Sequence, residues 1–246
     1  MSKLSDRIRR AARSEPAAFG FTAVAAKSKA PSLLIVVRLG PGEGGKATDA
    51  ANAGADAVIV SGDAGKLKDA GDAVLGAAPD STDRKTIAAL RDAGADFVVA
   101  TRDSLAEGML EEKIGFVLEL REDLEDTPLR LLGELSLDAI IVPAPKTPLT
   151  VQGALGLRRT AALGRAPLLV EDDGSADASL LHLLRDSGVA GVVVGASAIG
   201  KLGDLKARIE AIPARGKRRD NERDTPLVPA QATSGHDHDD DDDYDD

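Results

Sequence analysis

Charged side chains interrupt or end several apolar segments of this chain, and these are the residues that could do chemistry. Arg38 stands within Leu33–Leu39, Glu119 within Ile114–Leu120, and Glu171 ends Pro167–Glu171. An ionised group in such a segment needs either an opposite charge or a wet cavity. A glutamate enclosed by apolar side chains can serve as a general acid or base. Two interpretations follow: Glu119 or Glu171 catalyses proton transfer with Arg38 as counter-charge, or the arginine and a carboxylate form a structural ion pair.

Lys146 is a third candidate for catalysis. It follows the segment Asp138–Pro143 in the sequence Val-Pro-Ala-Pro-Lys. A desolvated lysine can attack a carbonyl and form a Schiff base. Two prolines separate it from the apolar segment, so we expect a loop position and keep Schiff-base chemistry as an alternative.

A glycine-rich stretch, Gly40-Pro-Gly-Glu-Gly-Gly-Lys46-Ala47-Thr48, nearly matches a nucleotide-binding P-loop. The match fails at Ala47, which stands where a hydroxyl should bind Mg²⁺, and Thr48 comes one position too late. We therefore expect a loop whose Lys46 meets an anion, or a plain solvated loop, rather than nucleotide hydrolysis.

These residues all follow short apolar segments that alternate with helical patterns. The predicted strands are Leu33–Leu39, Ala57–Ser61, Ala73–Ala77, Phe97–Thr101, Ile114–Leu120, Asp138–Pro143, Pro167–Glu171 and Gly191–Gly195. The predicted helices include Lys46–Gly54, Thr82–Gly94, Leu149–Gly164, Asp177–Gly188 and Ile199–Ile212. Eight strand–helix units are the number that closes a parallel barrel. The sequence thus predicts an α/β fold, a (βα)8 TIM barrel with a closed parallel sheet, in which Ala73–Ala77 is the segment that could instead extend a helix.

An internal echo accompanies this count. Leu90-Arg-Asp-Ala-Gly matches Leu184-Arg-Asp-Ser-Gly at an offset of 94 residues (184 − 90), which is four strand–helix units. Duplication of a half-barrel would explain the echo. Convergence of any two such units on a helix, a glycine and an apolar strand would explain it too.

The last two strands resemble a known group of barrels. Leu168-Leu-Val-Glu-Asp-Asp-Gly-Ser and Val189-Ala-Gly-Val-Val-Val-Gly-Ala-Ser are similar to strands seven and eight of the phosphate-binding barrels, which include indole-3-glycerol-phosphate synthase, thiamine-phosphate synthase and flavin-binding barrels. In that group, backbone N–H groups after both strands hold a phosphate. The resemblance implies phosphate binding by Gly174, Ser175, Gly195, Ala196 and Ser197. Asp172 and Asp173 depart from the pattern by adding negative charge to the loop.

Three parts of the chain follow from composition. We expect residues 1–30 to form an N-terminal extension with a short basic helix, residues 31–213 to form the barrel, and residues 214–246 to form a disordered tail with an acidic end. The basic helix has only Leu4 and Ile8 as sizeable apolar anchors, so we expect it to pack on the barrel rather than to lie on an anionic membrane. The formal net charge is −10, and His236–Asp246 contains eight aspartates. Within the extension, Phe19-Gly-Phe is a candidate plug for the bottom of the barrel.

The same composition bounds the partners. The chain has no cysteine and only 2% aromatic residues, which argues against disulfides and against base-stacking on nucleic acid. No apolar run is long enough to span a membrane, and we expect a cytoplasmic protein. The expected partner is a small anionic metabolite, with neither nucleic acid nor membrane, while the oligomeric state stays open.

Three functions fit these observations. The first is a lyase, isomerase or synthase that acts on a small phosphorylated or anionic metabolite. The second is a non-catalytic barrel, a scaffold or binding protein whose acidic tail contacts basic partners. The third is a flavin-binding barrel. No cofactor is required, although FMN would suit the resemblance and Mg²⁺ could bind the carboxylates at Glu171, Asp172 and Asp173.

Overall fold

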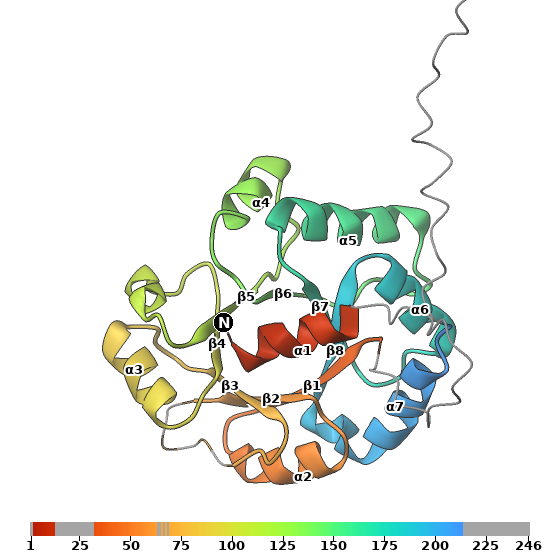
Figure 1. The fold of residues 1–246 in the computed structure, drawn as a ribbon. Helices are drawn as coiled ribbons and strands as arrows, with labels where there is room; N and C mark the ends of the chain where they lie inside the picture. The colour runs from red at the N-terminus through yellow and green to blue at the C-terminus, as the bar shows by residue number, and fades with distance from the viewer. Residues whose placement is uncertain (1, 13–31, 63–64, 66, 68, 214–246) are drawn as a thin grey trace, which may run out of the picture. The chain divides into compact units, whose positions relative to one another are not determined.

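The computed structural model describes residues 2–12, 32–62, 65, 67 and 69–213. Eight parallel strands pair in chain order, and β8 pairs with β1 to close a barrel (Figure 1). The strands are β1 (Leu34–Leu39), β2 (Ala57–Ser61), β3 (Val74–Ala78), β4 (Phe97–Ala100), β5 (Gly115–Glu119), β6 (Ala139–Val142), β7 (Leu168–Asp172) and β8 (Val189–Gly195). The predicted barrel is confirmed, and the Ala73 segment forms a strand rather than a helix.

Helices cover the outside of the barrel, although less regularly than predicted. The α-helices after the strands are α2 (Ala47–Asn52), α3 (Arg84–Asp92), α4 (Asp126–Leu132), α5 (Val151–Gly164), α6 (Ala178–Asp186) and α7 (Leu202–Glu210). A short 3-10 helix precedes each of two α-helices: η1 (Gly44–Lys46) precedes α2, and η4 (Ala196–Lys201) precedes α7. Only η3 (Ala106–Leu110) lies between β4 and β5, and the described residues between β2 and β3 contain no α-helix. The prediction of a complete strand–helix unit was therefore wrong between β4 and β5, where the connection is a 3-10 helix.

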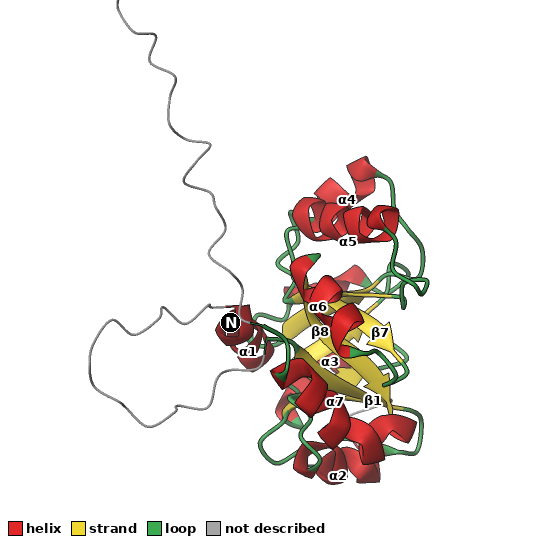
Figure 2. Cartoon of the chain, turned by 90° about the vertical axis from the view of Figure 1, so that its right-hand side faces the viewer, coloured by secondary structure: helices red, strands yellow, loops and turns green. Residues whose placement is uncertain are grey.

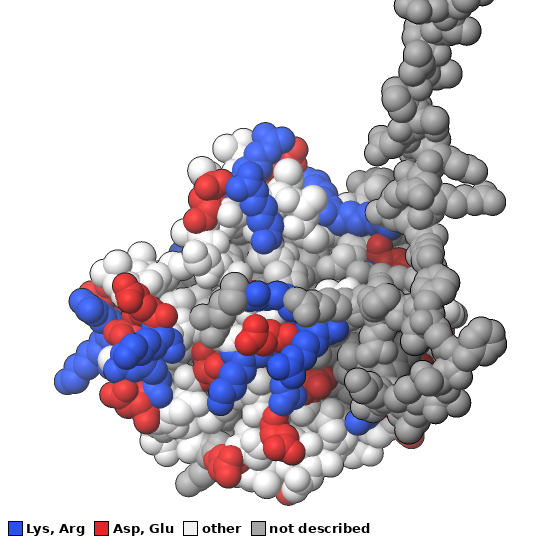
Figure 3. Space-filling model, in the orientation of Figure 1, with Lys and Arg blue, Asp and Glu red and all other residues white. Residues whose placement is uncertain are grey.

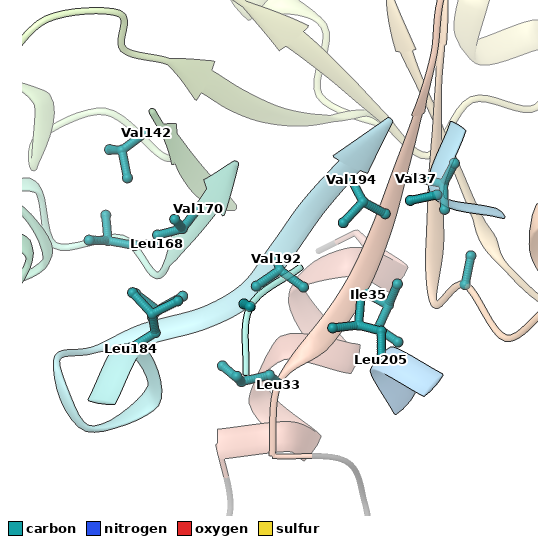
Figure 4. Close-up of a cluster of buried hydrophobic side chains, with 14 of the residues drawn as sticks. Leu33, Ile35, Val37, Val142, Leu168, Val170, Leu184, Val192, Val194 and Leu205 are labelled. Atoms are coloured by element: carbon teal, nitrogen blue, oxygen red, sulfur yellow. The ribbon is translucent and has the colours of Figure 1, made fainter. Parts of the chain in front are cut away.

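Alternation along the strands separates two apolar layers. Leu33, Ile35 and Val37 face the helices and pack in one large cluster (Figure 4). Leu34 and Val36 face the barrel interior and pack with inward side chains of the other strands. Because side chains alternate with a period of two, the next inward position on β1 is Arg38, at the carboxyl end of the strand.

The helix α1 (Lys3–Ala12) closes the amino-terminal end of the barrel (Figures 1 and 2). Leu4 and Ile8 are buried among the inward side chains of the strands. The Asp96 carboxylate, just before β4, accepts the N–H groups of Lys3 and Leu4 at 3.0 and 3.1 Å. The predicted packing of a basic helix on the barrel is thereby confirmed, and the opposite rim is left for a site.

Basic and acidic side chains alternate on the face that carries α1 (Figure 3). The Arg7 guanidinium lies 3.7 Å from the Asp56 carboxylate and donates to the Asp56 backbone oxygen at 2.9 Å. Burial raises the pKa of Asp56. These pairs tie α1 to the strand ends, whereas the predicted plug Phe19-Gly-Phe and the tail 214–246 lie outside the described residues.

No helix in the described part of the chain is long and apolar enough to cross a membrane.

Candidate functional site

Three of the predicted residues meet at the carboxyl-terminal rim of the barrel. Arg38 Nη2 donates to Glu119 Oε2 at 2.9 Å, and Arg38 Nη1 donates to Glu171 Oε1 at 3.1 Å. The three side chains come from β1, β5 and β7, so the arginine spans the interior of the barrel mouth. Glu119 is 13% exposed and Glu171 is 42% exposed. The same three residues could therefore form a structural ion pair or carry out acid–base chemistry, which are the two interpretations predicted from the sequence.

A cavity of about 330 Å³ adjoins this ion-pair cluster. Its lining residues are Glu119, Leu120, Arg121, Ile141, Pro143 and Glu171. Arg121 Nε lies 3.4 Å from Glu119 Oε1, so the Glu119 carboxylate contacts two guanidinium groups. A small polar molecule in this cavity would touch both glutamates.

The ion-pair cluster leaves one hydrogen-bond donor without a partner. Arg38 Nε is buried, and no acceptor within the described residues reaches it. A buried N–H without an acceptor is unfavourable. This donor is the only polar atom of the trio that is both buried and unsatisfied in the described structure.

The loop after β7 hydrogen-bonds to itself. Asp172 Oδ2 accepts the N–H of Gly174 at 2.7 Å, and Asp173 Oδ1 accepts the N–H of Ser175 at 2.8 Å. Hydrogen bonds from the Ser175 side chain and backbone lower the pKa of Asp173, and the charge of Lys201 adds to this effect. Carboxylates thus occupy two of the N–H groups that the resemblance assigns to phosphate.

The turn after β8 has no side-chain cap. Gly195 precedes η4, and no side-chain hydrogen bond caps this helix start. The first N–H groups of a helix have no acceptor within the helix, so those of Ala196 and Ser197 are candidate donors to a ligand. A Cβ built on Gly174 would lie 3.2 Å from the Ala198 Cβ, so the two predicted phosphate loops are adjacent.

Lys46 pairs within its own loop. Its Nζ lies 2.8 Å from Glu43 Oε1, and Glu43 Oε2 accepts the N–H of Gly40 at 2.9 Å. The Lys46 pairing lowers the pKa of Glu43. Because the Glu43 carboxylate fills the space that a P-loop keeps for phosphate, this loop does not have the geometry of a nucleotide site.

Lys146 stands apart from the ion-pair cluster. It is exposed in the loop after β6 and lines a second cavity, which α4 and α5 border. The described contacts place neither Lys46 nor Lys146 against Arg38 or its two glutamates.

A magnesium site does not fit the acidic run after β7. Glu171 binds Arg38, whereas Asp172 and Asp173 bind separate backbone N–H groups. No group of three or more histidine, aspartate or glutamate side chains in the described ranges could hold a metal ion.

The part played by Arg208 was not predicted from the sequence. This α7 residue donates from Nη2 to the backbone oxygen of Gly174 at 2.8 Å and from Nη1 to that of Ala176. It fixes the loop after β7 against the last helix. No local pattern marks it, because the loop it binds lies more than 30 residues away in sequence.

Comparisons with known proteins agree on the fold. No family model and no curated protein matches the sequence. A variant of the tryptophan synthase alpha-subunit from Pyrococcus furiosus matches in structure with a TM-score of 0.55 and 14% identity, over 74% of this chain and 98% of that chain. Thiamine phosphate pyrophosphorylase from Pyrococcus furiosus matches with a TM-score of 0.53 and 14% identity, over 74% and 98% of the two chains. At this identity the matches show a shared barrel fold.

Proposed function

We propose that this chain is a barrel enzyme, a lyase, isomerase or synthase, that acts on a small anionic or phosphorylated metabolite at the carboxyl-terminal rim. The observation that carries the proposal is the Arg38 side chain, which reaches two glutamates that line a cavity. Binding sites in barrels of this kind lie at this rim.

The two glutamates differ in exposure, and this suggests their roles. Glu171 is the more exposed partner, so an anionic group of the substrate can replace it on Arg38 Nη1. Glu119 is mostly buried and stays beside the reacting atoms, where its carboxylate can accept a proton and return it at another atom. Arg38 then orients the substrate and compensates its charge.

A phosphate or carboxylate at the far end of the substrate would bind the turn after β8. The N–H groups of Ala196 and Ser197, which follow Gly195 at the uncapped start of η4, would donate to it. Lys201, at the end of η4, adds a positive charge nearby. The two structural neighbours are named as a tryptophan synthase alpha-subunit and a thiamine phosphate pyrophosphorylase. Both names are compatible with this class of enzyme.

A second candidate function rests on the hydrogen bonds within the loop after β7. Asp172 and Asp173 already satisfy the N–H groups of Gly174 and Ser175, as they would in a barrel that binds no phosphate. Such a chain would be a non-catalytic scaffold whose acidic tail contacts basic partners. Salt-sensitive co-purification of a partner, lost on truncation at Ala214, would favour it.

Phosphate titration followed by amide NMR separates the two. The enzyme proposal predicts saturable shifts at Gly195, Ala196 and Ser197 on addition of inorganic phosphate, and weaker binding in Lys201→Met. Shifts spread over other surface amides, with none at this turn, would refute it. The flavin alternative stays a prediction, which the visible absorption spectrum of the purified protein tests. The expected cytoplasmic location also stays a prediction, which microscopy tests.

A further inference from the structure

A second cavity lies outside the barrel mouth, between the sheet and two helices. Its volume is about 420 Å³, within the range of roughly 300–1,000 Å³ that small-molecule pockets occupy. Helices α4 and α5 lie side by side (Figure 2), and residues of both helices line the cavity. Its walls are mainly aliphatic and include Leu120, Leu124, Leu129, Val142, Leu149 and Leu157.

Two glycines of α5, which have no side chains, help to leave this cavity open. Gly153 and Gly156 both line the cavity, three residues apart and so on one face of the helix. A Cβ built on Gly156 meets no atom within 4 Å. Glycine is a poor helix former, and alanine would fit here without a clash. The helix therefore carries an unfavourable residue at a point where a side chain would enter the cavity.

The charges at the rim of this cavity leave one cation uncompensated. Glu122 pairs with Arg102, and Asp123 pairs with Arg159 at 3.0 Å. Lys146 lines the same rim, and within the described residues it forms neither an ion pair nor a hydrogen bond. A ligand that complements this rim has an apolar body and a single negative charge.

We propose that the cavity between α4 and α5 binds a medium-chain carboxylate, with its chain between the helices and its carboxylate on Lys146. The aliphatic walls gain from burying the chain, and the lysine selects the anion over an uncharged chain of equal length. The site shares Leu120 and Pro143 with the cavity at the mouth. It does not depend on chemistry at Glu119, so the two proposals can fail separately.

Decanoate binding to the full chain, measured by calorimetry and by displacement of the dye anilinonaphthalene sulfonate, tests this proposal. Wild type should bind decanoate more tightly than decanol. Gly156→Leu should fill the cavity and weaken decanoate binding by at least about tenfold. Lys146→Met should weaken decanoate by about fivefold and leave decanol unchanged, which removes the preference for the anion.

Gly203→Leu is the matched control, because Gly203 is also a helical glycine with no atom within 4 Å of its Cβ position, and it is exposed on α7. It should bind decanoate like wild type, and circular dichroism should show both leucine variants folded. Wild-type affinity in Gly156→Leu would overturn the proposal. A wild-type chain that sediments as a dimer and binds no decanoate would also overturn it, and would assign the exposed Val151 and Leu155 of α5 to an interface between copies.

Discussion

Replacing Arg38 with methionine tests the centre of the candidate site. The change removes the only cation that contacts both Glu119 and Glu171 within the described structure, at 2.9 and 3.1 Å. Methionine keeps the apolar stem of the arginine, so the core beneath it is preserved. The variant therefore leaves two carboxylates facing one another across the mouth.

The size of the effect follows from distance and exposure. Two unit charges about 4 Å apart attract by about 4 kcal/mol at an effective dielectric constant near 20, and desolvation offsets much of this. Removing one partner of a fully buried pair costs about 3–5 kcal/mol. Arg38 is 25% exposed and Glu171 is 42% exposed, so water screens part of the loss. We expect Arg38→Met to lower the free energy of unfolding by about 2 kcal/mol at pH 7.

Urea denaturation at pH 7 measures this. Arg38→Met combined with Glu119→Gln should be more stable than Arg38→Met alone. Arg121→Met is the control, since Arg121 is 80% exposed and its loss should change stability by less than about 0.5 kcal/mol. If Arg38→Met unfolds like wild type at pH 7, or if the double variant is no more stable than Arg38→Met, this account of the ion pair is wrong.

Three further predictions concern the frame around the site. Leu4→Ala should lower the free energy of unfolding by about 2–5 kcal/mol in urea melts, because Leu4 is fully buried at the end of the barrel, and a loss under about 0.5 kcal/mol would show that α1 does not close it. Gly76→Ala should also destabilise the chain, since the added Cβ would lie 2.2 Å from the Phe97 ring, and Phe97→Leu should restore part of the loss; full stability of Gly76→Ala alone would contradict this packing. Hydrogen bonds from the Thr86 side chain and backbone, and from Ser81, lower the pKa of Asp83 to about 2 from 3.8, so the stability from this helix cap is complete above pH 3.8 and is lost as the pH falls through about 2. A carboxyl NMR titration should show that pKa rising toward 3.8 in Thr86→Val, and an unchanged value would contradict the assignment.

The repeat found in the sequence has a close structural counterpart. When 94 is added to their residue numbers, β3 (Val74–Ala78) and α3 (Arg84–Asp92) have the same bounds as β7 and α6. Asp83 and Asp177 both cap their helices by accepting a backbone N–H three residues on. Gly94 and Gly188 both have φ of +96°, a conformation that glycine adopts at least cost. The match extends to caps and turns, and both duplication and convergence remain consistent with it.

Local sequence patterns were enough to predict the eight strands, their boundaries to within two residues and the placing of Arg38, Glu119 and Glu171 at strand ends. This was possible because apolar periodicity, helix caps and turn glycines are local signals, each contained in a short stretch of chain. The packing of Leu4 and Ile8 under the barrel was equally visible as two apolar positions on a basic helix.

Which charged side chains meet depends on the folded barrel. Arg38 and Glu119 are 81 residues apart, and Arg38 and Glu171 are 133 apart, so their contact depends on how the closed sheet sets its register and tilt. The same holds for Asp172 and Asp173, whose side chains turn back onto their own loop, and for the space that α4 and α5 leave over the sheet. Partner choice and cavity shape arise from the summed packing of distant elements, and no short stretch of sequence carries that information.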